Sequence, residues 1–149
     1  MGTFQMRHFT PKDEAAVVAL WQRCGLVVWY NDPHEDIRRK MAYQPELFFV
    51  GTLNEKGDET IIASIMIGYE GHRGWINYLA VAPAYQGRGY GRRLMADAET
   101  VLRELDCPKI DLLVRSSNRE VIAFYEQLGF EVSDAVLLGK LLVEPDIEA

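Results

Sequence analysis

Hydrophobic residues recur along this chain at two spacings that alternate from one end to the other. Apolar runs bounded by turn residues predict strands, and apolar residues three and four apart predict amphipathic helices. The strand-like runs cover residues 4–9, 47–53, 60–69, 75–81, 110–114, 130–132 and 135–143. The helical spacing covers about 11–24, 33–43, 92–105 and 118–128. The order β α α β β β α β α β β predicts an α/β or α+β fold.

Turn and cap residues support these boundaries. Thr10 with Asp13 three residues later is typical of a helix start, and Ser117 predicts a similar cap for the last helix. The polar residues 54–58 predict a hairpin turn between two strands. Gly129 suits the C-terminal cap of the last helix.

Composition narrows the class of protein. A chain of 149 residues with 48% hydrophobic and 26% charged residues is expected to form a single domain over 1–149. No apolar run approaches the ~20 residues of a spanning helix, and the first residues show no apolar signal segment, which predicts a cytoplasmic protein. Cys24 and Cys107 are isolated, so free thiols are expected and no metal site.

Charge argues against nucleic acid as a partner, because the formal net charge is −6 and basic residues gather in two short clusters. One cluster, Arg38 to Lys40, alternates with Glu35 and Asp36 and is interpreted as a solvated helix face. The other is Arg88, Arg92 and Arg93, where a polyanionic ligand would need cations. We expect neither a nucleic acid nor a membrane as partner.

The hexapeptide QGRGYG at residues 86–91 joins a strand-like run to a helix-like one. A glycine-rich hinge of this kind points backbone N–H groups into one concavity, beside the positive end of the helix dipole, and so binds phosphate. A dinucleotide-binding loop would need glycine where Arg92 stands, and the Gly-Lys-Ser/Thr end of a P-loop is absent. The hinge therefore predicts some other phosphate-bearing ligand.

Two motifs carry a resemblance to a known family. Gln86, Gly89 and Gly91 fit the pattern Gln/Arg-x-x-Gly-x-Gly/Ala, and residues 117–131 are similar to an Asn-x-x-Ala-x-x-x-Tyr-x-x-x-Gly-Phe motif. The chain thereby resembles the GNAT (GCN5-related) superfamily of acyl-CoA-dependent N-acyltransferases. Residues 29–33 and 69–74 further resemble its bacterial YpeA-like subgroup. The resemblance implies a mixed, mostly antiparallel sheet of about seven strands flanked by about four helices.

The resemblance also implies acetyl-CoA as the acyl donor. The main-chain N–H of Leu79 would polarise the thioester carbonyl, the glycine loop with Arg92 would hold the pyrophosphate, and Asn118 would support the donor. The implied donor-binding residues are Leu79, Ala80, Val81, Gln86, Gly87, Arg88, Gly89, Tyr90, Gly91, Arg92, Asn118 and Tyr125.

Acyl transfer to an amine has two proton requirements. An alkyl ammonium with a pKa near ~10.4 must lose a proton before it attacks, and the departing thiolate must gain one. The resemblance places Tyr125 as the general acid; from the residues alone a packed helix aromatic would be favoured.

The general base is not where relatives carry it, because Trp75 and Leu113 stand at the two places that hold a glutamate elsewhere in the superfamily. The nearest titratable substitutes are Glu70, His72 and Asp111. We favour Glu70, whose charge would also attract a cationic acceptor, over His72, whose ordinary pKa of ~6.5 suits a base. Both also fit solvated loop residues.

The acceptor pocket is predicted at Trp29, Tyr30, Asn31 and Asp32, because aromatic rings beside a carboxylate suit an organic cation. The alternative is that the aromatics are core anchors and the polar pair caps a helix.

The sequence thus predicts an N-acetyltransferase in which a small-molecule or peptide primary amine attacks the thioester directly, and it leaves a homodimer open. One alternative is a non-catalytic module that binds acyl-CoA. Another is acetylation of protein α-amines, because residues 114–118 resemble the ribosomal-protein N-terminal acetyltransferases, although Leu113 departs from them.

Overall fold

The computed structural model describes residues 2–143, which fall into two compact units, residues 2–112 and 113–143. Within the described residues, the first unit holds every strand and all the α-helices except α4. The single domain over 1–149 stays a prediction. None of the helices in residues 2–143 is both long and apolar enough to cross a membrane.

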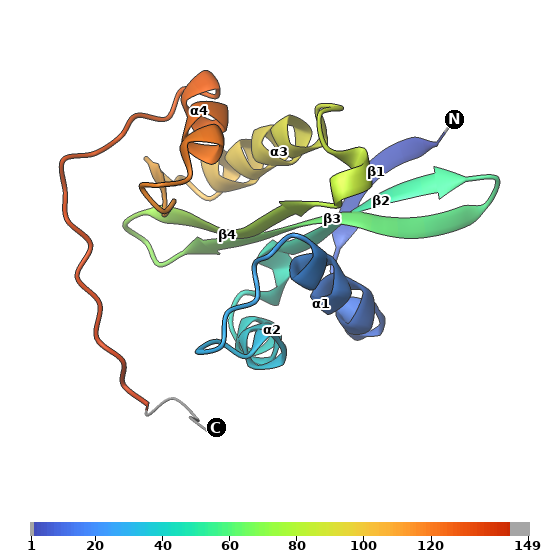
Figure 1. The fold of residues 1–149 in the computed structure, drawn as a ribbon, viewed down its shortest axis with the longest axis horizontal. Coiled ribbons are helices and arrows are strands. Elements are labelled where there is room, and N and C mark those ends of the chain that lie inside the picture. The colour runs from blue at the N-terminus through green and yellow to red at the C-terminus, as the bar shows by residue number, and fades with distance from the viewer. Residues whose placement is uncertain (1, 144–149) are drawn as a thin grey trace. The chain divides into compact units, whose positions relative to one another are not determined.

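The first unit is built on a mixed sheet whose strands follow one another in chain order (Figure 1). Its strands are β1 (Thr3–His8), β2 (Phe48–Glu55), β3 (Asp58–Tyr69), β4 (Gly74–Val81) and β5 (Ile110–Leu112). The pairs from β1 to β4 are antiparallel, and β5 is parallel to β4. The hairpin predicted around residues 54–58 is confirmed, but its five-residue turn is wrong: the turn is only Lys56 and Gly57, because the strands stay paired as far as Glu55 and Asp58.

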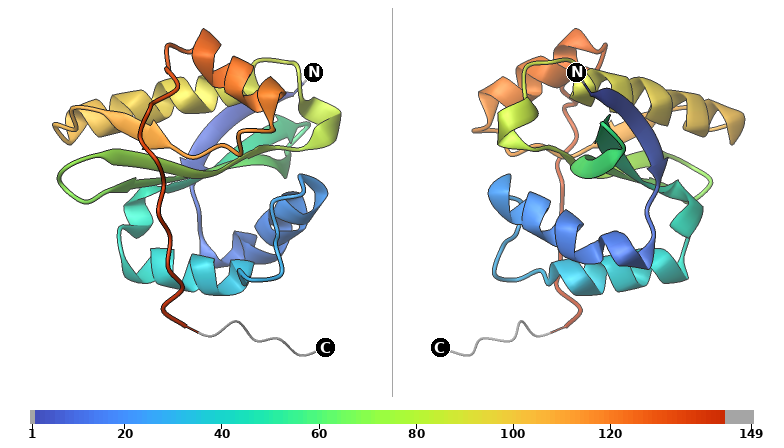
Figure 2. Two further views of the ribbon diagram at one scale, coloured as in Figure 1. Left: turned by 60° about the vertical axis from the view of Figure 1, so that its left-hand side comes forward. Right: turned by 90° about the vertical axis from the view of Figure 1, so that its right-hand side faces the viewer.

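Helices cover both faces of this sheet. The helices of the unit are α1 (Glu14–Arg23), α2 (Pro33–Ala42) and α3 (Tyr90–Glu104), with 3-10 turns η1 (Pro11–Asp13), η2 (Pro45–Leu47) and η3 (Pro83–Tyr85). Figure 2 shows α1 and α2 on one face and α3 on the other. The strand, helix, helix order predicted for the N-terminal half is therefore confirmed.

The apolar stripes of α1 and α3 face the sheet, as their spacing predicts. Trp21 of α1 is fully buried, and the α3 side chains of Leu94, Ala98 and Leu102 are buried against the opposite face. Burying a large aliphatic side chain stabilises a fold by about 1.5–3 kcal/mol, so these stripes fix both helices on the sheet. The predicted stripe of α3 ends early, because Leu105 is 45% exposed.

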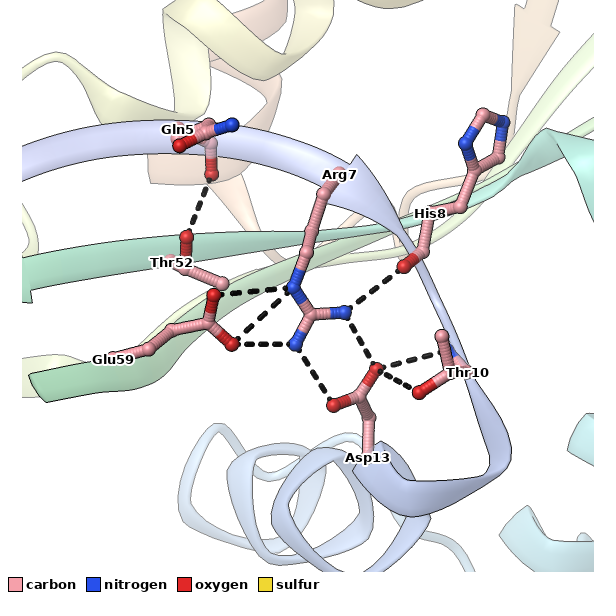
Figure 3. Close-up of polar contacts among 7 residues, drawn as sticks. All are labelled: Gln5, Arg7, His8, Thr10, Asp13, Thr52 and Glu59. Atoms are coloured by element: carbon pink, nitrogen blue, oxygen red, sulfur yellow. Dashed lines mark hydrogen bonds and ion pairs between the residues drawn. The ribbon is translucent and has the colours of Figure 1, made fainter.

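A network of charges ties β1, η1 and β3 together; we call Arg7, Asp13 and Glu59 the Arg7 cluster (Figure 3). The Arg7 guanidinium lies 2.8 Å from Asp13 and 2.6 Å from Glu59. Asp13 also accepts hydrogen bonds from the N–H and hydroxyl of Thr10, so the predicted capping box is present. The Arg7 guanidinium lowers the pKa of the largely buried Asp13 carboxyl.

The second unit holds one helix, α4 (Arg119–Gln127). Its N-cap is Asn118, whose side chain accepts a hydrogen bond from the N–H of Val121, so the predicted cap at Ser117 is off by one residue. Gly129 follows the helix with φ +95°, a conformation that favours glycine, as its predicted cap role requires.

The prediction of about seven strands is wrong: five are present in the described residues, and 130–132 and 135–143 form neither helix nor strand. An apolar run makes a strand only where a ladder partner satisfies the backbone and a surface covers the side chains. Here Val136, Leu138 and Leu142 are 80%, 89% and 91% exposed. The fold class, α+β with a mixed and mostly antiparallel sheet, is confirmed.

Candidate active site

Strand β4 contains a β-bulge near its C-terminal end. Between Asn77 and Ala80 the strand has two residues, Tyr78 and Leu79, where β3 has one. On its other side β4 pairs with β5 only as far as Ile76. The bulged segment therefore has no strand beside it on that side among the described residues, and its backbone lies at an edge of the sheet.

Tyr78 is held in this bulge by contacts on three sides. Its φ is +52°, an unusual value for a bulky residue in a strand. Its ring stacks on Trp21 with centroids 3.7 Å apart, and its hydroxyl donates to the carboxylate of Asp36. Its backbone carbonyl accepts from the hydroxyl of Ser64, at 2.8 Å, and Trp21 Nε1 donates to that same hydroxyl, at 2.9 Å.

The glycine loop follows directly from β4 and η3. Gly87 and Gly89 have φ of +79° and +84°, and a Cβ built on either would have no neighbour within 4 Å. Gly89 is the N-cap of α3, and no side chain caps the first turn of that helix. Gln86 donates to the carbonyl of Val81 at 2.9 Å, which ties the loop to the end of β4. The loop thus presents an open helix N-terminus, a ready anion site.

Cations flank this loop. Arg88 and Arg92 are exposed, and the Arg88 guanidinium lies 5.3 Å from the ring centre of Tyr85. Arg93, which the sequence grouped with them, instead lies 4.9 Å from the ring centre of Phe4 and donates to its carbonyl. Arg88 and Arg92 therefore face solvent beside the loop, whereas Arg93, although exposed as well, also holds β1 against α3.

The loop between α1 and α2 carries the residues predicted for the acceptor. Trp29 and Tyr30 are 74% and 42% exposed and meet edge to face, so they are not core anchors. Asn31 lies in a turn that its N–H closes on the carbonyl of Val28. Asp32 is the N-cap of α2, accepting from the N–H of His34 at 2.9 Å. Exposed aromatics thus stand beside a carboxylate that is already a helix cap.

Glu70 and His72, the predicted bases, lie in the β3–β4 turn. The Glu70 carboxylate accepts hydrogen bonds from the N–H groups of His72 and Arg73 and from Trp75 Nε1. These bonds favour the charged form and lower the pKa of Glu70 to about 2. At about 3.3 Å per residue, the start of β4 is roughly 17 Å from Leu79. Their roles as bases stay predictions.

Asp111, the third carboxylate considered as a base, lies in β5 and pairs with Trp75 of β4. Lys109 and Arg73 lie 3.2 Å and 3.9 Å from its carboxylate. It is therefore ion-paired at the end of β4 away from the bulge.

The remaining predicted site residues, Tyr125 and Asn118, belong to the second unit. Tyr125 lies on α4, edge-on to Phe124 and Phe130 of its own unit. Burial raises the pKa of Tyr125 to about 12, so the phenol is protonated and able to donate at neutral pH. Asn118 is exposed at the start of α4. Their parts in catalysis and donor binding stay predictions.

Comparison with known proteins decides to which family the chain belongs. A profile of the acetyltransferase (GNAT) family matches residues 14–130, most of the chain. The chain belongs to the GNAT acetyltransferase family. It is therefore an acetyltransferase, of a family that uses acyl-CoA donors. The narrower likeness to the YpeA-like subgroup stays a prediction.

Bacterial relatives support the GNAT assignment over nearly the whole chain. An acetyltransferase of Yersinia pestis (strain Pestoides F) is 42% identical over 139 residues, which are 93% of this chain and 96% of the relative. An acetyltransferase of Pectobacterium atrosepticum is 44% identical over 140 residues, 94% of this chain and 96% of the relative. The similarity thus extends well beyond the two motifs.

Solved structures share the GNAT fold. Ard1 from Thermoplasma volcanium is 27% identical, with a TM-score of 0.73 over 87% of this chain and 84% of that one. A protein of Clostridium acetobutylicum, described as a predicted acetyltransferase and solved with acetyl-CoA, is 20% identical with a TM-score of 0.68 over 95% and 97%. The second likeness supports the fold alone.

Tyr78 and Asp36 are the residues of this site that sequence reasoning missed. Asp36 was interpreted as part of a solvated helix face, and Tyr78 as one position of a strand. Hydrophobic periodicity does not predict a bulge, because a bulge is an extra residue in one strand relative to the strand that it pairs with. The available signal is Ser64, a polar residue inside the apolar run 61–67, which is fully buried at the bulge.

Proposed function

We propose that this enzyme transfers an acetyl group from acetyl-CoA to a primary amine, which attacks the thioester directly. One observation carries the proposal. Within a single compact unit, the bulge of β4 leads straight into a glycine loop that ends on the uncapped N-terminus of α3. One stretch of backbone thus offers N–H groups both to a carbonyl and to a pyrophosphate.

The glycine loop supplies the donor site. Gln86 through Gly91 with Arg88 and Arg92 would bind the pyrophosphate, because an open helix N-terminus and two exposed guanidiniums both favour an anion. The pantetheine arm would then run along Leu79 to Val81 at the unpaired edge of β4. This is the part of the donor that carries the thioester.

The Leu79 N–H supplies the carbonyl donor. Negative charge develops on the thioester oxygen as the amine attacks, and a fixed backbone donor there lowers the barrier. The bulge sets the direction of this N–H, because it takes Tyr78 and Leu79 out of the regular ladder with β3. No side chain has to reorganise during the step.

Tyr125 is the proposed acid. Its phenol would protonate the departing thiolate, and the high pKa of Tyr125, about 12, keeps that proton in place until the thiolate forms. The phenylalanine variant, Tyr125→Phe, is expected to lower kcat roughly a hundred- to ten-thousandfold, the usual size of a general-acid effect. Its acetyl-CoA affinity, measured by calorimetry, should stay within about threefold. Unchanged turnover removes Tyr125 from the mechanism.

The acceptor is proposed to enter beside the α1–α2 loop. Trp29 and Tyr30 offer exposed rings, and Asp32 adds negative charge, which together suit the cation of a small-molecule or peptide amine in the cytoplasm. For the base, a group with a pKa near neutrality is best suited. The low pKa of Glu70 makes it a weak base, and His72 lies in the same turn far from Leu79, so we propose that water takes the proton and passes it toward His72.

The test is a thiol-release assay. The protein is mixed with acetyl-CoA and a panel of polyamines, aminoglycosides and protein N-terminal peptides, and free CoA is measured with a thiol reagent. We expect release above the amine-free background for at least one class of amine, with an acetylated product of matching mass. Release that no amine raises would overturn the proposal and favour a module that binds acyl-CoA without turnover.

A further inference from the structure

The bulge of β4 depends on support from outside the strand. A non-glycine residue with positive φ is strained by about 1–3 kcal/mol, and such strain persists only where the surroundings hold it. Tyr78 carries this strain at φ +52°. Because the N–H of Leu79 follows in the same bulge, whatever holds Tyr78 also aims that N–H.

The support consists of three side chains, Trp21, Ser64 and Asp36, which with Tyr78 we call the Tyr78 clamp. The ring of Tyr78 lies nearly parallel to that of Trp21, at an interplanar angle of 10°. Ser64 fixes the carbonyl of Tyr78 and is itself fixed by Trp21. These two residues hold the ring and the carbonyl, and Asp36 holds the far end of the side chain.

Asp36 differs from the other two in its surroundings. Trp21 and Ser64 are fully buried, whereas the Asp36 side chain is 27% exposed and its second oxygen lies 3.3 Å from the exposed Arg39. Burial, with the Asp36 carboxylate next in importance, raises the pKa of Tyr78, so the phenol remains a donor across the physiological range. A partly exposed carboxylate on α2 thus reaches the strained backbone of β4 through one phenol.

We propose that Asp36 and Tyr78 are positioning residues for acyl transfer: the Asp36 carboxylate holds the Tyr78 phenol, and the phenol holds the β4 bulge in the shape that aims the Leu79 N–H at the thioester carbonyl. The inference rests on the proposed function, because the carbonyl has to lie at Leu79. It also joins α2, which begins at the predicted acceptor segment, to the backbone that polarises the donor.

Three variants test the positioning role. Tyr78→Phe keeps the ring stacked on Trp21 and removes only the hydroxyl. Asp36→Ala removes the acceptor of that hydroxyl, whereas Asp36→Asn keeps an oxygen that can still accept it. Glu35→Ala is the matched control, because Glu35 is the neighbouring carboxylate on α2 and pairs only with Arg38 among the contacts described.

Kinetics and backbone resonances are measured together at a temperature where every variant is folded. For Tyr78→Phe and Asp36→Ala we expect kcat to fall roughly ten- to hundredfold, as when a donor of this kind is displaced by about 1 Å. The acetyl-CoA Kd should stay within about threefold. The 15N–1H resonance of Leu79 should shift in both variants, and neither readout should move in Glu35→Ala.

Asp36→Asn separates positioning from proton transfer, because it is expected to keep most of the kcat. A loss equal to that of Asp36→Ala would make the charge itself essential and would overturn the positioning role. Unchanged kcat in folded Tyr78→Phe would overturn it as well, with the proposed function intact. If the unmodified enzyme releases no thiol with any amine, the proposed function falls first and the inference with it.

Discussion

The Arg7 cluster and the Tyr78 clamp both join helices to the sheet, but they are built differently. In the Arg7 cluster a guanidinium is neutralised by two carboxylates, one of them largely buried (Figure 3). The backbone of these three residues is not strained by a positive φ. In the Tyr78 clamp a single partly exposed carboxylate holds a phenol on a strained backbone. Local strain that the surroundings must support is typical of functional sites, and saturated pairing is typical of structural ones.

The largest effect is expected from Arg7→Ala. Removing the guanidinium leaves Asp13 buried and uncompensated, which costs about 3–5 kcal/mol when the pair is buried. Urea unfolding should show a loss near the lower end of that range, because Arg7 is itself partly exposed. Arg103→Ala, which breaks an exposed pair with Glu99 of 3.9 Å, should cost less than about 0.5 kcal/mol. Equal losses would refute a structural role for the cluster.

The pH dependence of the cluster follows from Asp13. Its folded-state pKa is lowered by Arg7, so the pairing stabilises the fold above the ordinary aspartate pKa of ~3.9 and the contribution is lost as pH falls through the folded pKa. Compared with Asp13→Asn, the unmodified protein should be more stable at pH 7, and the gap should narrow below about pH 4. A gap that is constant from pH 7 to pH 3 would contradict this sign.

Two glycines with the same backbone conformation, one in the proposed donor site and one outside it, allow a comparison in which a smaller effect is expected. Gly89, in the donor loop, and Gly57, in the β2–β3 turn, have φ of +84° and +85° and open space where a Cβ would stand. Alanine at either should cost about 1 kcal/mol of stability, because both suffer the same backbone strain. Only Gly89→Ala should weaken acetyl-CoA binding, by roughly tenfold in calorimetry. If Gly57→Ala weakens acetyl-CoA binding to a similar extent, the glycine loop is not the donor site.

The smallest effect on activity is expected from Glu70→Gln. With a pKa of about 2, Glu70 is charged throughout the working range, so it cannot produce the acidic limb of a kcat/KM profile near neutral pH. Its lowered pKa contributes stability above the ordinary value of ~4.3 that is lost as pH falls toward 2. We expect kcat within about threefold and an unmoved acidic limb. If the acidic limb of the kcat/KM profile disappears in Glu70→Gln, Glu70 is the base after all.

Periodicity and cap residues predicted most of the first unit, including the stripe of α3 and the glycine loop. These features are local, so a few residues determine them. The bulge at Tyr78 was not predicted because it depends on the register between β3 and β4. The charge pattern of α2 predicts that Asp36 is solvated, because the sequence does not show that Tyr78 of β4 lies within hydrogen-bond distance of its carboxylate. Residues 135–143 are apolar enough for a strand, but no described strand pairs with them.

Binding of the donor at the β4 bulge is tested most directly by an NMR titration of the 15N-labelled enzyme with acetyl-CoA, beside a parallel titration with CoA. Donor binding at the bulge predicts that acetyl-CoA shifts the amide resonances of Gly87, Gly89 and Leu79 and leaves Gly57 unmoved, and that CoA, which keeps the pantetheine arm but lacks the thioester carbonyl, shifts the loop as far but Leu79 less. Saturation with acetyl-CoA that leaves Leu79 unmoved would contradict it.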